Sequence, residues 1–272
     1  MKWLIGIAVC AAAIGCAEPQ PDPAGEVRIV SLSPAMTRTI VQVGIGGHLI
    51  GRSAFCSGVD SLPVVGDLQH LDAERLVRLQ PTHVMVQRTE ADVEPLLAKL
   101  AAQQGWTVVA HPIVSLDDVE SLLERLPEAF PDVHIGPACD ALRTRLREAR
   151  RPVAAAATLR VLIVGGGPAP LAWGDDTYLG QLVAATGANN PIKGRVWRTL
   201  TLEDIARLDV DVLLVPSEGP DPDVSQLEVA VGADRIRILP FEGIEIPGPH
   251  LAQLAKPIRA LLSGDAAYTG SP

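Results

Sequence analysis

The sequence is poor in aromatic residues and in cysteine or histidine motifs. Aromatic residues make up 3% of its 272 residues, and none of its four cysteines forms a CxxC pair. Without such pairs, a zinc ribbon built on cysteine is excluded. The six histidines form no HxH or HExxH motif, and neither a GxSxG elbow nor a P-loop is present. We therefore expect no intrinsic metal or cofactor and no enzymatic activity.

Positive charge is also scarce. The chain has 23 Lys and Arg residues against 32 Asp and Glu residues, a formal net charge of -9. Such an acidic chain is a poor candidate for nucleic-acid binding. Beyond residue 26 no apolar run is long enough to cross a membrane. A hydrophobic content of 47% is enough for packed cores, and the length fits about two lobes.

The first residues have the pattern of a bacterial export signal. Residues 1–16 read MKWLIGIAVCAAAIGC, with a basic residue followed by a short apolar run and small residues. The segment ending at Cys16 resembles a lipobox, in which cleavage leaves the cysteine for lipid attachment. Residues 17–26 are rich in proline and read as a tether. We expect an extracytoplasmic, membrane-anchored lipoprotein; the alternative is an ordinary secretory signal with an incidental cysteine.

One short pattern occurs twice. LDAERLVRL at 71–79 precedes an apolar strand, and LTLEDIARL at 200–208, 129 residues later, precedes another. Each copy begins with a good helix N-cap, Asp72 or Thr201. We interpret this as a duplicated α/β lobe, although one short match can arise by chance. Cys56 and Cys139 are left in an oxidising compartment, either paired or free.

A charged, helix-favouring stretch at 137–151 lies between the two copies and predicts a rigid connector. Strands alternate with helices on either side, which favours largely parallel sheets covered by helices on both faces. The predicted division is a signal peptide at 1–16, a tether at 17–26, an N-terminal lobe at 27–131, a connecting helix at 132–157, a C-terminal lobe at 158–264 and a tail at 265–272.

Several motifs resemble a known family. They are RIVSLSPAMTRTIVQVG from residue 28, GRSAFC from residue 51 and LPVVGDLQHLDAERLVRLQPTHVMV from residue 62. They resemble the helical-backbone (class III) substrate-binding proteins of ABC importers for cobalamin, iron-siderophore and haem, and most of all the cobalamin-binding members. The resemblance runs from Val27 to Leu262. It implies two α/β lobes bridged by one long helix, with the ligand in a cleft between them, and a monomer.

The resemblance also implies which residues line that cleft. Phe55 stands where the cobalamin binders have Tyr, Leu68 and Gln87 where they have Trp, and Leu171 where Phe is usual. Trp197 matches a cleft Trp, so some aromatics are kept and others lost. The predicted cleft residues are Phe55, Leu68, His70, Gln87, Arg88, Leu171, Trp173 and Trp197. Tyr178 is assigned instead to the core or the surface.

Two further roles follow from the resemblance. Glu74 and Glu203 take the places where the family docks onto arginines of the membrane permease. His70 sits where it can face the metal of a haem or a corrinoid. Arg88, together with Arg195 and Arg198, would make the cleft partly basic and favour an anionic chelate.

The predicted function is capture of a metal-chelate cofactor (a corrinoid, a ferric siderophore or haem) for delivery to an ABC permease. Two alternatives remain. One is a diverged sensor or scaffold with the same fold, favoured by the aromatics missing at Leu68 and Gln87. The other is an exported small α/β enzyme, for which the sequence offers no nucleophile–base set.

Overall fold

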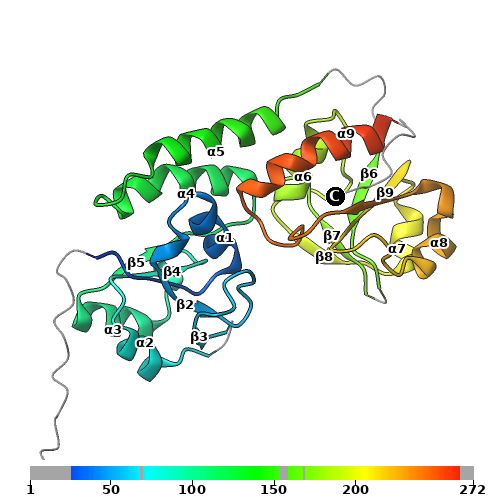
Figure 1. The fold of residues 1–272 in the computed structure, drawn as a ribbon. Coiled ribbons are helices and arrows are strands. Elements are labelled where there is room, and N and C mark those ends of the chain that lie inside the picture. Colours follow the sequence, from blue (N-terminus) through cyan, green and yellow to red (C-terminus); the bar gives the residue numbers. More distant parts are fainter. Residues whose placement is uncertain (1–25, 68–69, 154–158, 168, 264–272) are drawn as a thin grey trace, which may run out of the picture.

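The computed structural model describes residues 26–67, 70–153, 159–167 and 169–263. The predicted signal peptide with its lipidation site Cys16, most of the tether, Leu68 and the tail at 265–272 lie outside these residues. Within them the chain forms two α/β lobes, each built on one five-stranded sheet (Figure 1). The predicted fold class is confirmed.

The N-terminal lobe contains a parallel sheet with the strand order β3-β2-β1-β4-β5. Its central strand β1 is fully buried, as expected of a parallel sheet covered on both faces. Its elements are β1 (Ile29–Ser31), α1 (Pro34–Gln42), η1 (Gly46–His48), β2 (Leu49–Ser53), β3 (Val64–Gly66), α2 (Ala73–Leu79), β4 (His83–Val86), η2 (Glu90–Asp92), α3 (Pro95–Gln104) and β5 (Thr107–Ala110).

The C-terminal lobe has the strand order β10-β9-β6-β7-β8. In both lobes the second and third strands lie on one side of the first strand, and the fourth and fifth lie on its other side, so the two sheets share one order. However, β7 runs antiparallel to both β6 and β8. Its elements are β6 (Val161–Val164), β7 (Leu171–Trp173), α6 (Tyr178–Ala184), β8 (Trp197–Thr199), α7 (Leu202–Arg207), β9 (Val212–Ser217), α8 (Ser225–Val231), η3 (Ala233–Arg235), β10 (Ile236–Pro240), η4 (Pro249–Leu254) and α9 (Ala255–Ser263).

The two predicted helix caps are both formed. Asp72 accepts a hydrogen bond from the backbone N–H of Arg75 at 2.9 Å, and Thr201 accepts one from Asp204 at 3.1 Å. These caps satisfy backbone donors that the first turn leaves unpaired. Helix α3 starts at Pro95, a residue suited to the first helical turn.

The connection between the lobes is made by α4 (Leu116–Ala129) and α5 (Gly136–Ala149), which lie side by side (Figure 1). Arg147 pairs with Glu120 at 2.9 Å, and Arg143 pairs with Glu124 at 3.1 Å. The connector is therefore not a lone helix, because α4 covers one of its faces. The predicted segment 132–157 extends past α5 into residues 154–157, which lie outside the described residues.

One hydrophobic core joins the two lobes. A single cluster contains Met36 of α1, Leu126 of α4, Leu146 of α5 and Leu182 of α6. The segment before α4 is also bonded to α6, because Tyr178 donates its backbone N–H to the carbonyl of Val114 at 3.0 Å. Shared packing of this kind holds the lobes in a fixed relation. The cysteines do not pair: Cys56 and Cys139 are both free and buried.

Candidate functional site

The site lies where each sheet changes the direction in which its strands are added. In the N-terminal lobe the chain builds β2 and β3 on one side of β1, then returns to place β4 on the other. Ser33 and Pro34 follow β1, and Gln87 and Arg88 follow β4. In open α/β sheets, ligands bind beyond the carboxyl ends of the strands at such a switch point. The corresponding switch point of the C-terminal lobe lies between β6 and β9.

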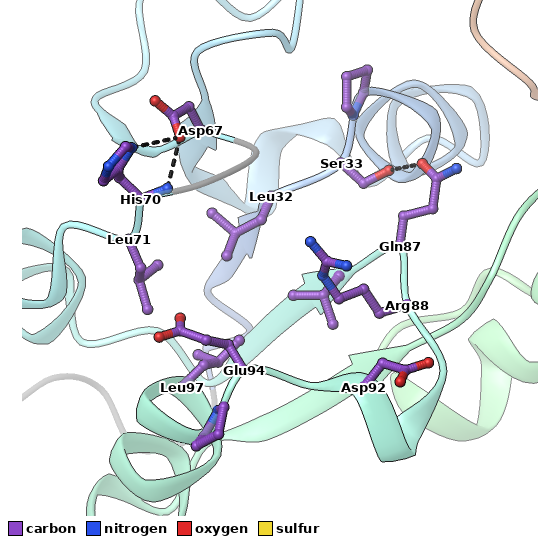
Figure 2. Close-up of a pocket in the computed structure, with 13 residues that line it drawn as sticks. Leu32, Ser33, Asp67, His70, Leu71, Gln87, Arg88, Asp92, Glu94 and Leu97 are labelled. Atoms are coloured by element: carbon purple, nitrogen blue, oxygen red, sulfur yellow. Dashed lines mark hydrogen bonds and ion pairs between the residues drawn. The ribbon is translucent and has the colours of Figure 1, made fainter.

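The first hollow, which we call the polar hollow, has a volume of about 610 Å³. It is lined by the turn after β1, the loop before α2, the segment after β4 and the start of α3. Three predicted site residues, His70, Gln87 and Arg88, line it. Figure 2 shows the Arg88 side chain reaching into the space between Leu32 and Gln87. Its polar lining is completed by Ser33, Asp67, Asp92 and Glu94.

The second hollow, the aromatic hollow, has a volume of about 430 Å³. Most of its lining belongs to the C-terminal lobe, and Gln87 and Ile113 come from the N-terminal lobe. It is lined by Gln87, Ile113, Gly165, Gly166, Ala169, Leu171, Trp173, Tyr178, Trp197, Pro216, Glu245 and Pro247. Leu171, Trp173 and Trp197, predicted from distant parts of the sequence, thus come together in one wall.

Gln87 belongs to the lining of both hollows. Its side-chain oxygen accepts a hydrogen bond from the Ser33 hydroxyl at 2.8 Å, and its side-chain nitrogen donates to the carbonyl of Ile113 at 2.9 Å. Ser33 is itself fixed as the N-cap of α1. The Gln87 side chain is therefore fixed by the protein at the boundary between the two hollows, with both of its polar atoms already hydrogen-bonded.

The aromatic wall is built by strand register and hydrogen bonding. Trp173 of β7 lies opposite Trp197 of the edge strand β8, so both side chains project on one face. The Trp173 indole N–H donates to the Tyr178 hydroxyl at 3.3 Å, which donates in turn to the carbonyl of Glu245 at 3.1 Å. Burial raises the pKa of Tyr178, so it stays a neutral donor. Trp197, 39% exposed, supplies the open face of this wall.

The expectation that Arg195 adds free positive charge to the cleft is wrong. Its guanidinium pairs with Asp118 at 2.9 Å and with Asp176 at 3.3 Å, so it ties α4 to the segment before α6. Burial alone would raise the pKa of Asp118. Hydrogen bonds from the backbone of Val114 and Ser115 outweigh it and lower that pKa. Arg198 is not among the residues lining either hollow. Of the three arginines expected in the cleft, Arg88 is therefore the one that belongs to the described lining.

Two predicted cleft residues are not placed at the site. Phe55 is 55% exposed on the loop after β2, outside the lining of both hollows. Leu68 lies outside the described residues. Other lining residues were not predicted from the sequence, among them Ser33, Asp67, Asp92, Glu94, Ile113, Tyr178, Glu245 and Pro247. Of these, Ser33 was open to prediction, because it directly follows a strand at a switch point.

The predicted docking residues occupy equivalent positions in the two lobes. Glu74 and Glu203 are both the second residue of their helices, α2 and α7, and both are exposed. The Glu203 carboxylate pairs with Arg207 one turn on, at 2.6 Å. A carboxylate in a first helical turn also favours the helix dipole, so position alone does not assign a docking role.

Among the residues that the structure describes, no helix is long and apolar enough to cross a membrane. In the same part of the chain, no group of three or more His, Cys, Asp or Glu side chains is arranged to hold a metal ion.

Comparison with known proteins was made by sequence and by structure. No protein-family model and no curated protein sequence matches the chain. Solved structures do match. The periplasmic haem-binding protein HutB of Vibrio cholerae is 22% identical, with a TM-score of 0.68 over 87% of this chain and 99% of that one. The periplasmic vitamin B12-binding protein BtuF of Vibrio cholerae is 18% identical, with a TM-score of 0.67 over 88% and 98%.

A third structure, Staphylococcus aureus IsdE complexed with haem, is 20% identical, with a TM-score of 0.64 over 87% of this chain and 99% of that one. At such identities the similarity establishes the fold. The chain has the two-lobed fold of the class III periplasmic substrate-binding proteins, as the sequence motifs predicted. HutB and BtuF are both described as periplasmic binding proteins.

Proposed function

We propose that the chain is an extracytoplasmic solute-binding lipoprotein that captures a metal-chelate cofactor and delivers it to an ABC permease. The observation that carries this proposal is the pair of hollows at the two switch points, joined at Gln87 and walled on one side by Trp173, Tyr178 and Trp197. A rigid aromatic face beside a polar recess suits a large, flat ligand with polar groups at its edge.

The structures compared add support from outside the chain. They are described as binding vitamin B12 or haem, both metal chelates. The shared core between the lobes favours a site that exists before the ligand arrives, which lowers the ordering cost of binding. His70, at the mouth of the polar hollow, stays a candidate for contact with the chelated metal. Membrane anchoring through Cys16 stays part of the proposal.

A binding titration tests this function. Residues 26–272, expressed without the signal, are titrated with cyanocobalamin, cobinamide, haemin and several ferric siderophores, followed by Trp fluorescence and visible absorbance. We expect saturable binding to one chemical class. Trp197→Ala should weaken it about tenfold or more, because it removes the open face of the aromatic wall.

Val229→Ala provides the matched control, because Val229 is 87% exposed and far in sequence from either hollow. It should leave binding unchanged. A folded protein that binds none of these ligands would contradict the importer function and favour the sensor or scaffold. That alternative is also consistent with Gln87 standing where the family has an aromatic residue.

Docking onto the permease is tested separately. We expect Glu74→Ala with Glu203→Ala to abolish co-purification with the ABC permease in detergent while ligand affinity is unchanged, because neither residue lines the polar hollow or the aromatic hollow. The control pair Glu128→Ala with Glu228→Ala removes two exposed carboxylates from other helices, α4 and α8. Equal capture by both double variants would rule out a docking role for the first pair.

A further inference from the structure

We infer that the ligand of this site carries no net negative charge: it is a neutral or cationic metal chelate whose edge bears amides or other uncharged groups. The inference rests on the proposed function and names the chemical class of its ligand. It reverses the expectation of an anionic chelate, which came from three arginines counted in the sequence.

Carboxylates predominate among the charged groups of the described lining. The polar hollow has Asp67, Asp92 and Glu94, and the aromatic hollow has Glu245. Arg88 is the one guanidinium among the described lining residues. Leaving aside His70, whose ring nitrogen lies 3.5 Å from the Asp67 carboxylate, four carboxylates against one guanidinium give a formal charge of -3. The neighbouring undescribed positions 68, 69 and 168 are Leu, Gln and Pro, which add no charge.

Two cations near the aromatic wall, Arg195 and Lys193, are already engaged by the protein, and Arg198 follows Trp197 on β8, so its side chain projects to the opposite face of the strand. Arg195 is held by Asp118 and Asp176, and Lys193 pairs with Asp175 at 3.1 Å. Because these pairs are satisfied within the chain, they offer little attraction to an incoming anion. The basic residues that the sequence places around the aromatic wall therefore do not offset the carboxylates of the lining.

The opposite interpretation, that the ligand is anionic, depends on Arg88. Its side chain has no ion pair or hydrogen bond with any other described residue, so it is free to bind a ligand. However, it shares the polar hollow with Asp92 and Glu94, and Asp92 is held in place by the Thr89 hydroxyl at 2.5 Å. An anionic ligand reaching Arg88 enters the field of these carboxylates. A cationic ligand is repelled by Arg88 alone, and a neutral ligand can accept hydrogen bonds from Arg88 through its amide oxygens.

The first experiment compares three probes on residues 26–272: aquocyanocobinamide, which is cationic; cyanocobalamin, which is neutral overall; and haemin, which carries two propionates. We expect one of the two corrinoids to bind at least tenfold more tightly than haemin. Affinity for the cationic probe should fall as salt is added. Tighter binding of haemin, or of an anionic ferric chelate from the wider panel, would overturn the inference and leave the proposed function standing.

Arg88 either repels a cationic ligand or anchors an anionic one, and removing its charge changes the affinity for the ligand in opposite directions in the two cases. Arg88→Gln should tighten binding of the cationic probe about fivefold, since a like charge is removed. If Arg88 anchors an anionic ligand, the same change weakens binding of haemin and of the preferred ligand. Arg145→Gln, an exposed change on α5 outside both hollows, controls for net charge and should have no effect.

Glu94→Gln is the converse test. It should weaken binding of the cationic probe about fivefold and strengthen binding of haemin, with Glu128→Gln on α4 as the matched control. Equal effects of Glu94→Gln and its control on every probe would overturn the inference. If no chelate of any charge binds, the proposed function fails, and the inference fails with it.

Discussion

Phe130→Ala should lower the free energy of unfolding by about 3–5 kcal/mol. Phe130 ends α4 and is fully buried, with 0% of its surface exposed. Its ring lies 4.6 Å from the ring of His83, centroid to centroid, at the start of β4. It belongs to the core that both lobes share, so the cavity left by truncation has rigid walls on several sides and closes poorly. Chemical denaturation monitored by far-UV circular dichroism measures the change.

The core that the two lobes share also predicts how many unfolding transitions this experiment shows. The variant should still unfold in one cooperative transition, since the lobes are packed on the same residues. Val229→Ala, at an 87% exposed position, should change stability by less than about 0.5 kcal/mol. A loss below about 1 kcal/mol at Phe130, or two separate transitions in the wild-type protein, would contradict a single core.

The parts of the fold that could be predicted are those governed by local chemistry. Asp72 and Thr201 cap short helices in front of buried strands, and both signals lie within a few residues of the structure they predict. The same pattern in both halves also predicted a duplicated lobe, and the two sheets have the same strand order. The antiparallel course of β7 was not predictable in this way. It depends on pairing with β6 and β8, which are separated from it along the chain.

The site was harder to predict because it depends on partners that are distant in sequence. Trp173 and Trp197 were identified as aromatic residues, but their place on one face follows from strand register. Tyr178 was assigned to the core or surface; it is 2% exposed and also lines the aromatic hollow, through contacts with Trp173 and Glu245. Arg195 was counted as a cleft cation, and only the structure reveals the acidic partners that neutralise it.

Acidification should destabilise the protein between pH 6.5 and about 4 through His250. This residue of η4 is 5% exposed. Burial and the nearby Arg38 together lower its pKa to about 4, against the opposing effects of the hydrogen bond to Gly243 and of Glu218. The unfolded chain binds a proton at His250 below pH 6.5, whereas the folded chain stays neutral until about pH 4. Stability is therefore complete above pH 6.5 and falls by about 3 kcal/mol across this window.

The surroundings of His250 explain why it resists protonation. Its Nε2 donates to the carbonyl of Gly243 at 3.0 Å, its ring stacks on Phe241, and its buried Nδ1 has no partner among the described residues. His83 and His111 also have lowered pKa values, mainly because of burial, and act in the same direction. The measured loss over this window will therefore exceed the His250 share, and a variant is needed to isolate it.

His250→Gln isolates that share, because glutamine keeps a donor toward Gly243 but binds no proton near neutral pH. Denaturation at a series of pH values should give a slope that is shallower than in the wild type, by up to about 1.4 kcal/mol per pH unit. His134→Gln, at an exposed position, should keep the wild-type slope. Aspartates with lowered pKa values, such as Asp118, lose their stabilising effect progressively below about pH 5, so the slope is compared between pH 6.5 and 5. A wild-type slope in His250→Gln would show that the acid response arises elsewhere.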